Sequence, residues 1–216
     1  IFISAGEHDM ADNIVHIVLA RLPGAPAGTK GISLFIVPKF NVNDDGSIGE
    51  RNPVNCGSIE HKMGIKASAT AVLIFDKATG YLIGPENRGL NCMFTFMNTA
   101  RIGTAVQGLT AAEIAFQGGL SYAKDRIAMR ALSGAKAPEL AADPIIVHPA
   151  VRNMILTSKA FAEGGRALVY YLSQFSDVVA KGEGEAQVYA DQMLSLLTPI
   201  AKAFLTETGY EAANHG

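Results

Sequence analysis

The chain has 216 residues, 49% of them hydrophobic, and a formal net charge of −2. This length is enough for one large domain or two small ones, and the near-neutral charge argues against nucleic acid or an anionic membrane as the main partner. No apolar run reaches the ~18 residues that span a bilayer, and the two cysteines, Cys56 and Cys92, lack metal-type spacing. We therefore expect a cytoplasmic protein without a membrane span.

The first part of the chain has the pattern of antiparallel strands. Short β-branched runs, separated by turn signals, predict strands at residues 1–4, 14–21, 31–38, 70–76 and 81–84. Residues 41–55 contain Asp44-Asp45-Gly46 and predict a loop or hairpin excursion. Because the chain opens on a strand pattern, we interpret residues 1–84 as part of a β-domain that begins upstream of Ile1.

From residue 89 onward, Ala, Leu and Met recur at helical spacing. The pattern predicts helices at about 89–129, 150–181 and 185–214, with a loop at 134–147. The second helix has a seven-residue repeat, formed by Met154, Phe161, Leu168 and Phe175. This repeat indicates near-parallel, left-handed packing, and Ser158 and Gly165 on the same side would let another helix approach closely. Pro199 predicts a kink or a break in the third helix.

These patterns predict an α+β fold in two domains. Residues 1–84 form a partial antiparallel β-domain, and residues 85–216 form an antiparallel, four-helix-type bundle that is truncated before its end.

Most motifs that resemble a site have a simpler explanation. The acids and histidines of Glu7-His8-Asp9, with Asp12 and His16, are not fixed on one face, so we expect no metal there. The chain has no glycine-rich dinucleotide fingerprint, nucleophile elbow or Cys/His nucleophile pair. We interpret Arg88, beside the glycine-rich join, as a solvated residue at the start of a helix.

Three residues remain as candidates. Arg101 and Arg126 stand on otherwise apolar helices, where a guanidinium needs a phosphate or a carboxylate as partner. For either arginine alone, an internal salt bridge is the simpler interpretation. Ser4 ends a strand that opens into Ala5-Gly6, where its hydroxyl and nearby backbone N–H groups could face a ligand. The alternative is an ordinary strand-end serine.

Segments along the whole chain match one protein family in the family's own order. Residues 2–6 resemble its aromatic-Ile-Thr/Ser-small-Gly segment, and residues 31–38 its Gly-Ile-Ser-x-Phe-x-Val strand. Residues 62–70 resemble its Lys-x-Gly-x-(Arg/Lys)-x-Ser-x-Thr turn, with the strand end Phe75-Asp76 after it. Residues 82–89 resemble its connection into a helical bundle, and residues 98–101 and 122–126 resemble that bundle's two arginine motifs.

Together these segments resemble the acyl-CoA dehydrogenase family. The sequences of residues 60–64 and 97–103 most resemble those of the large-subunit branch that includes 3-methylmercaptopropionyl-CoA dehydrogenase. The resemblance implies FAD-dependent α,β-desaturation of an acyl-CoA thioester, with hydride transfer to flavin N5 and an electron-transfer flavoprotein as acceptor. It also implies a homodimer or homotetramer.

The resemblance assigns roles residue by residue. Phe2 stands where the family places an aromatic ring against the flavin, and Ser4 matches the hydroxyl that hydrogen-bonds flavin N5. Arg126 matches the arginine that reaches the FAD pyrophosphate across a subunit interface. Arg101 matches an arginine near the acyl-thioester pocket, and Asn98 occupies a position where other branches carry Asp.

The resemblance assigns no catalytic residue to this chain. In the family the base is usually a Glu beside a Gly-Gly-x-Gly segment, which we expect beyond Gly216. The 216-residue piece alone is therefore expected to be inactive and to bind FAD weakly or not at all. Two alternatives stay open: an acyl-CoA oxidase or flavin monooxygenase of the same fold, and a non-catalytic helical assembly module.

Overall fold

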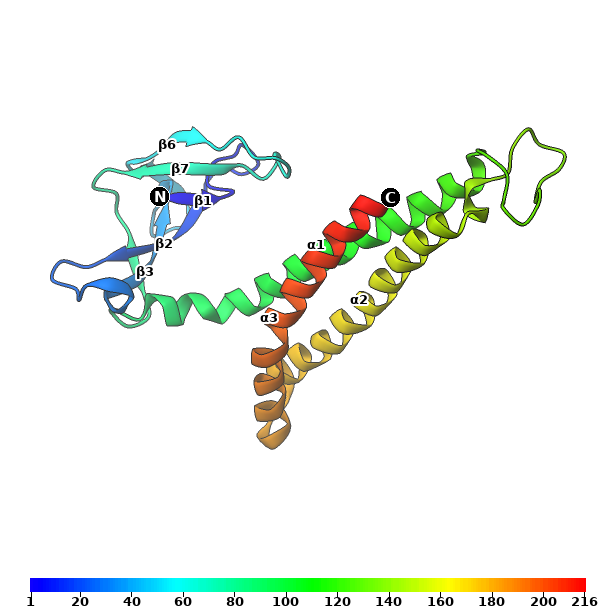
Figure 1. Ribbon diagram of the computed structural model, residues 1–216. Coiled ribbons are helices and arrows are strands. Elements are labelled where there is room, and N and C mark those ends of the chain that lie inside the picture. The colour runs from blue at the N-terminus through cyan, green and yellow to red at the C-terminus, as the bar shows by residue number, and fades with distance from the viewer. The chain divides into compact units, whose positions relative to one another are not determined.

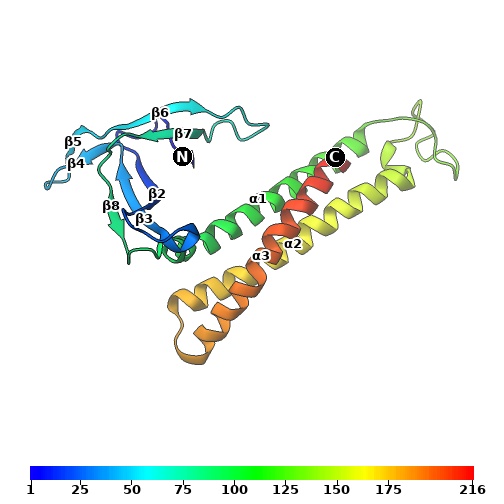
Figure 2. The ribbon, with the colours of Figure 1, turned by 60° about the vertical axis from the view of Figure 1, so that its left-hand side comes forward.

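A computed structural model describes all 216 residues and divides them into two compact units, Ile1–Thr95 and Phe96–Gly216. The first unit holds every strand and the first turns of helix α1 (Gly89–Asp125) (Figure 1). The second unit holds the rest of α1 together with α2 (Pro149–Lys181) and α3 (Gly184–His215) (Figure 2). The α+β fold predicted from the sequence is confirmed.

The strands of the first unit form two three-stranded antiparallel sheets and a hairpin. One sheet has the order β1 (Phe2–Ser4), β7 (Thr70–Phe75), β6 (Val54–Ile59), and the other has β2 (Val15–Arg21), β3 (Ile32–Pro38), β8 (Tyr81–Ile83). The hairpin joins β4 (Phe40–Val42) to β5 (Ile48–Arg51), and a short 3₁₀ turn, η1 (Gly28–Gly31), precedes β3.

The two larger sheets share one apolar core. Its buried residues come from β2, β3, β6 and β7, and are Val18, Val37, Val54, Ala71 and Leu73. Along β2 the side chains alternate, so that His16 and Val18 are buried whereas Val15 and Ile17 are exposed. This alternation follows from the geometry of a strand, in which successive side chains point to opposite faces.

The sequence predicted the strands of the two larger sheets correctly, except for β6. The five predicted strands match β1, β2, β3, β7 and β8 to within one residue at each end. β6 was missed, because Asn55, Gly57 and Ser58 interrupt its apolar alternation. Only Val54 at its start is fully buried, so most of this strand carries no hydrophobic signal.

The helices of the second unit pack through small side chains. The buried positions of α2 follow a four-three spacing and are Ser158, Ala162, Gly165, Val169 and Leu172. The predicted seven-residue period is therefore present, but its large residues lie half-buried beside this line of small ones. α1 and α3 approach closely at two glycines: a Cβ on Gly209 would lie 2.3 Å from the carbonyl oxygen of Gly108.

The predicted end of the first helix is wrong, and the third helix is continuous. α1 ends at Asp125 and not near Met129, because the backbone of Ala128 and Met129 turns to hydrogen-bond Asp143. For Pro199 the sequence predicted a kink or a break: α3 continues through Pro199 without a break, and the helix bends along its length (Figure 1). A proline removes only one N–H donor, and buried residues on both sides of it, among them Thr198 and Ala201, hold both parts of the helix against the rest of the unit. None of the helices combines the length and the apolarity that a membrane-spanning segment requires.

Candidate functional site

Phe2 and Ser4 lie on the same accessible face of β1. In the register with β7, Phe2 stands opposite Val72 and Ser4 opposite Thr70. Ile3, between them, packs against the core. Because alternate side chains of a strand point to opposite faces, Phe2 and Ser4 share the outer face. Phe2 is 69% exposed, so both its ring and the Ser4 hydroxyl are open to a ligand.

A buried histidine supports the turn that follows Ser4. Ala5 has a φ of 53°, and the Gly6 N–H donates to the Ile3 carbonyl at 3.2 Å. His16 is only 3% exposed and its Nε2 lies 2.9 Å from the Gly6 carbonyl oxygen, as a donor would. From the sequence, we considered His16 only as a possible metal ligand. Its burial on β2 could have been predicted from alternation, but its contact with the Gly6 turn depends on the fold.

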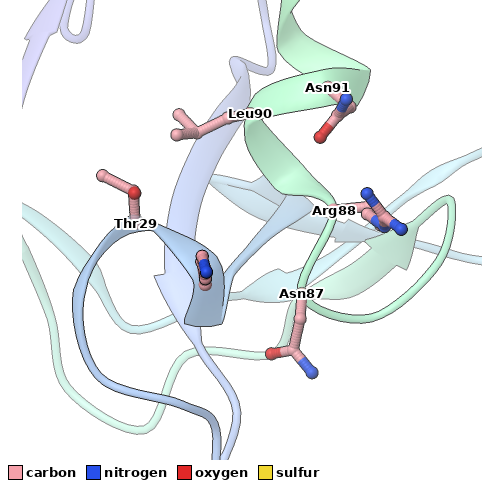
Figure 3. A pocket seen from close by; sticks show the side chains of 6 residues that line it. Thr29, Asn87, Arg88, Leu90 and Asn91 are labelled. Carbon is pink, nitrogen blue, oxygen red and sulfur yellow. The ribbon is translucent and has the colours of Figure 1, made fainter.

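The first unit also contains a cationic cleft, drawn in Figure 3. Its cavity measures about 430 Å³ and lies between the η1 turn and the start of α1. Its lining consists of Thr29, Lys30, Asn87, Arg88, Leu90 and Asn91. No carboxylate lines it, and neither Lys30 nor Arg88 takes part in a salt bridge. The first turn of α1 also leaves backbone N–H groups free at this end.

The chemistry of the cleft suits an anionic group. Two unpaired cations and a helix N-terminus attract a phosphate or a carboxylate. Asn87 donates its backbone N–H to the Ser33 hydroxyl at 2.8 Å, while its side-chain oxygen is buried without a hydrogen-bond partner. Arg88, interpreted from the sequence as simply solvated, is exposed and also borders this cavity.

Asn98 and Arg101 lie together on α1. They are three residues apart, so they share one side of the helix, and both are half-buried. The hydrophobic residue beside them, Ile102, packs against the cluster formed by Leu172, Leu194 and Ala201. Asn98 and Arg101 are therefore partly covered within the helical unit.

Arg126 lies just past the other end of α1 and is exposed. The inward position at this end is Ala123, which is 2% exposed, so Arg126 does not extend an inward-facing row as the sequence had indicated. The salt bridge considered as its alternative role is not formed. Glu113 instead binds Arg166 and Gln117, each at 2.5 Å. Arg126 takes part in no ion pair of the chain and is open to an external anion.

The structure therefore groups the predicted residues within each unit. Phe2 and Ser4 share a strand face in the first unit, and Asn98 and Arg101 share a helix face in the second. Arg126 stands at the far end of the same helix. No group of three or more His, Cys, Asp or Glu side chains is arranged to hold a metal ion.

Comparison with known proteins extends over the whole chain. No family model matches. A 3-methylmercaptopropionyl-CoA dehydrogenase of Ruegeria pomeroyi is 48% identical over 216 residues, which are 100% of this chain and 36% of that protein. A butyryl-CoA dehydrogenase of Syntrophomonas wolfei is 38% identical over 218 residues, covering 97% of this chain and 35% of the relative.

Solved structures agree on the fold. The crystal structure of Caenorhabditis elegans ACDH-11 in complex with C11-CoA superimposes with a TM-score of 0.78, covering 99% of this chain and 33% of that one at 21% identity. The chain thus spans about a third of the length of the curated relatives it matches. The 3-methylmercaptopropionyl-CoA dehydrogenase among these relatives is of the branch indicated by residues 60–64 and 97–103. The chain belongs to the acyl-CoA dehydrogenase family.

Proposed function

We propose that this chain is the flavin-facing part of a FAD-dependent acyl-CoA dehydrogenase that desaturates an acyl-CoA thioester between Cα and Cβ. The observation that carries the proposal is the pairing of Phe2 and Ser4 on one accessible strand face. An exposed aromatic ring offers a stacking surface, and a hydroxyl two residues away offers a hydrogen bond at the edge of the stacked ring. The 48% identity to a dehydrogenase of this class supports it.

The residues present fit FAD. Phe2 would pack against the flavin ring, and Ser4 would donate its hydroxyl to flavin N5 from a turn that His16 supports. Arg126, exposed and without an ion pair, would bind the pyrophosphate through the two-pronged contact that a guanidinium makes with phosphate oxygens. When bound, FAD supplies the acceptor for the hydride that leaves Cβ.

The substrate is an acyl-CoA. Asn98 and Arg101 are assigned to the wall of the acyl-thioester pocket, and the cationic cleft to a phosphate-bearing part of a bound ligand. No residue of this chain is assigned as the base that removes the Cα proton. Glu207 and Glu211 on α3 are both exposed and do not match the motif expected for it.

The remaining assignments follow from the same family membership. We place an electron-transfer flavoprotein as the electron acceptor and a homodimer or homotetramer as the assembly. The free cysteines, Cys56 and Cys92, fit a reducing compartment, and we assign the cytoplasm.

Replacement of Ser4 in the full-length protein tests the proposal. Ser4→Ala removes the hydroxyl but leaves the apolar stacking surface of Phe2. We expect anaerobic reduction of the flavin by acyl-CoA, followed by its absorbance, to slow about 10-fold or more. Bound FAD should remain near one per chain, because a single hydroxyl contributes little to its affinity.

A matched control keeps the result specific. Ser58→Ala removes an exposed hydroxyl from β6 of the same sheet and should leave the reduction rate unchanged. An unaltered rate in Ser4→Ala would contradict the proposed role. Rapid reoxidation of the reduced flavin by air alone would indicate an oxidase, and absence of any flavin from the full-length protein would indicate an assembly module.

A further inference from the structure

A buried carboxylate lies at the centre of the loop that joins α1 to α2. We name residues 126–148 the connecting loop. Asp143 within it is 0% exposed. Its carboxylate accepts hydrogen bonds from the backbone N–H groups of Ala131, Lys136 and Ala137, each at 2.8 Å. Arg130 adds a guanidinium contact at 3.2 Å.

These donors keep the Asp143 side chain charged. The hydrogen bond from the Ala131 N–H lowers the pKa of Asp143 most; burial acts to raise the pKa, and the N–H groups of Ala137 and Lys136 and the Arg130 guanidinium lower it further. The pKa is held well below its usual range, so the carboxylate is ionised at neutral pH. An ionised acceptor with several donors is a strong local constraint on the backbone that carries them.

The backbone of Asp143 extends this constraint to the residues after Arg126. Its carbonyl accepts from the Ala128 N–H at 2.9 Å, and its N–H donates to Met129 at 2.8 Å. Next along the chain, the Ile145 N–H donates to the carbonyl of Arg126 itself at 2.8 Å. Residues 143–145 at the end of the connecting loop are thus paired, antiparallel, with residues 126–129 at its start.

Further contacts hold the same segment. His148 lies at the start of α2, and its Nε2 is 2.9 Å from the Ala128 carbonyl oxygen. Met129 has a φ of 62°, a left-handed conformation that a non-glycine residue adopts only when its surroundings require it. On the other side, the Arg126 N–H still donates to Tyr122 within the helical pattern. The backbone of Arg126 is therefore fixed from both directions.

Fixing this backbone matters because the Arg126 side chain has no ion pair to orient it. A flexible arginine loses conformational entropy when it binds an anion, and prior ordering of its backbone reduces that loss. A loop of this length without such contacts would sample many conformations.

We propose that Asp143 is a positioning residue for Arg126: its carboxylate orders the connecting loop and thereby orients the guanidinium toward an anionic cofactor. This inference rests on the proposed contact between Arg126 and the FAD pyrophosphate. Asp143 itself is buried within the loop and acts only through Arg126.

A double-mutant cycle on FAD affinity separates this role from a general loss of structure. The dissociation constant of FAD is measured on the refilled full-length apoprotein for the wild type, Asp143→Ala, Arg126→Ala and the double variant. We expect Asp143→Ala to weaken binding about 10-fold in the wild type and less than about 2-fold in the Arg126→Ala background. Glu139→Gln, which removes an exposed charge from the same loop, should leave affinity unchanged.

The outcomes distinguish the two proposals. Unchanged affinity in Arg126→Ala would overturn the assignment of Arg126 and the positioning role with it. If Arg126→Ala weakens binding but Asp143→Ala acts equally in both backgrounds, or not at all, the positioning role is wrong and the FAD assignment stands.

A milder variant covers the case in which Asp143→Ala fails to fold. Arg130→Ala removes the guanidinium contacts with Asp143 and with the carbonyls of Ala137 and Leu140, and leaves the three backbone donors to Asp143 in place. It should weaken FAD binding by a smaller factor, again only when Arg126 is present. Equal effects in both backgrounds would overturn the proposal.

Discussion

The two units of this chain expose their candidate cofactor-binding residues by different means. In the first unit the strand period places Phe2 and Ser4 on the open face and Ile3 in the core. In the second unit Arg126 lies beyond the last turn of a helix, where no period applies. Its place depends on the connecting loop and on Asp143. A residue on a strand can thus be located from local sequence, whereas a residue at a helix end requires its loop.

The units also differ in how their cores are filled. The first is built around aliphatic side chains such as Val18, Val54 and Leu73, which interlock between two sheets. In the second, glycine and alanine stand where helices cross, and the backbones approach closely. Added volume should therefore be poorly tolerated at the helix crossings.

Arg126→Ala is expected to have the largest effect, a loss of FAD affinity. It tests whether the second unit contributes to cofactor binding, as Ser4→Ala tests the first unit. It removes a charge-assisted contact and leaves phosphate oxygens poorly satisfied. We expect about 2–4 kcal/mol less binding free energy, or roughly 30- to 1,000-fold weaker FAD binding. Arg126→Lys should recover only part of this, because an ammonium cannot form the planar fork. The flavin content of the folded full-length variant measures the effect, and Ser4→Ala should by contrast change rate and not content.

Arg166→Ala is the matched control for this prediction. Arg166 is also an exposed arginine of the helical unit, but its guanidinium binds Glu113. Its loss should lower the melting temperature slightly and leave the flavin in place. The same behaviour in Arg126→Ala, full occupancy with a lower melting temperature, would show that Arg126 is structural.

Gly108→Ala is expected to have the next largest effect, a loss of stability. It tests whether close helix crossings limit the packing of the second unit. An added Cβ would lie 2.2 Å from the Leu205 carbonyl oxygen and 2.6 Å from its carbon. Both are backbone atoms of α3, so one helix must shift, and we expect a loss of about 1–3 kcal/mol in the free energy of unfolding. Chemical denaturation of the full-length protein measures it.

Gly164→Ala provides the opposite expectation at a neighbouring helical site. Gly164 lies on α2 with nothing near the position of an added Cβ. Alanine there should stabilise the helix by about 0.5–1 kcal/mol, because glycine loses more backbone entropy on folding. Similar effects of the two substitutions would mean that the helix crossings do not limit the packing of this unit.

Elements that depend on local sequence patterns were predicted from the sequence. Features that depend on contacts with residues far away in the chain were missed. Short β-branched runs predicted the strand that carries Phe2 and Ser4, and the family resemblance singled out these two residues. The seven-residue period of α2 indicated its packed side. β6 escaped because its apolar pattern is interrupted by polar residues and glycine. The partners of β6 are set by β7, and no local signal reports them.

Asp143 was missed for a related reason. Most of its donors are backbone N–H groups, which every residue except proline carries, so no side-chain motif marks them. Prediction of the end of α1 failed at the same place, since the contacts with Asp143 turn the chain away from helix after Arg126. The cationic cleft likewise joins Lys30 to Arg88 across a long stretch of sequence.

The smallest expected effect concerns pH and the contact between α1 and α2. Glu113 on α1 accepts hydrogen bonds from Gln117 and from Arg166 of α2. The Gln117 bond lowers its pKa most; partial burial acts to raise the pKa, and Arg166 lowers it further, so the net shift is downward. A lowered folded-state pKa means that this stabilisation is complete above the unfolded value, about 4.3 for Glu, and is lost as pH falls through the folded one.

Comparison of Glu113→Gln with the wild type tests whether the charge of Glu113 stabilises the unit through its ion pair with Arg166. Since Arg166 is 44% exposed, solvent screens the interaction, and we expect only about 0.5 kcal/mol at neutral pH. The difference in melting temperature between wild type and variant should be present at pH 7 and shrink toward pH 3, as the wild-type carboxylate takes up its proton. A difference that stays constant over this range would assign the effect to packing of the side chain rather than to its charge. The ion pair between the two helices would then contribute nothing measurable to the stability of the unit.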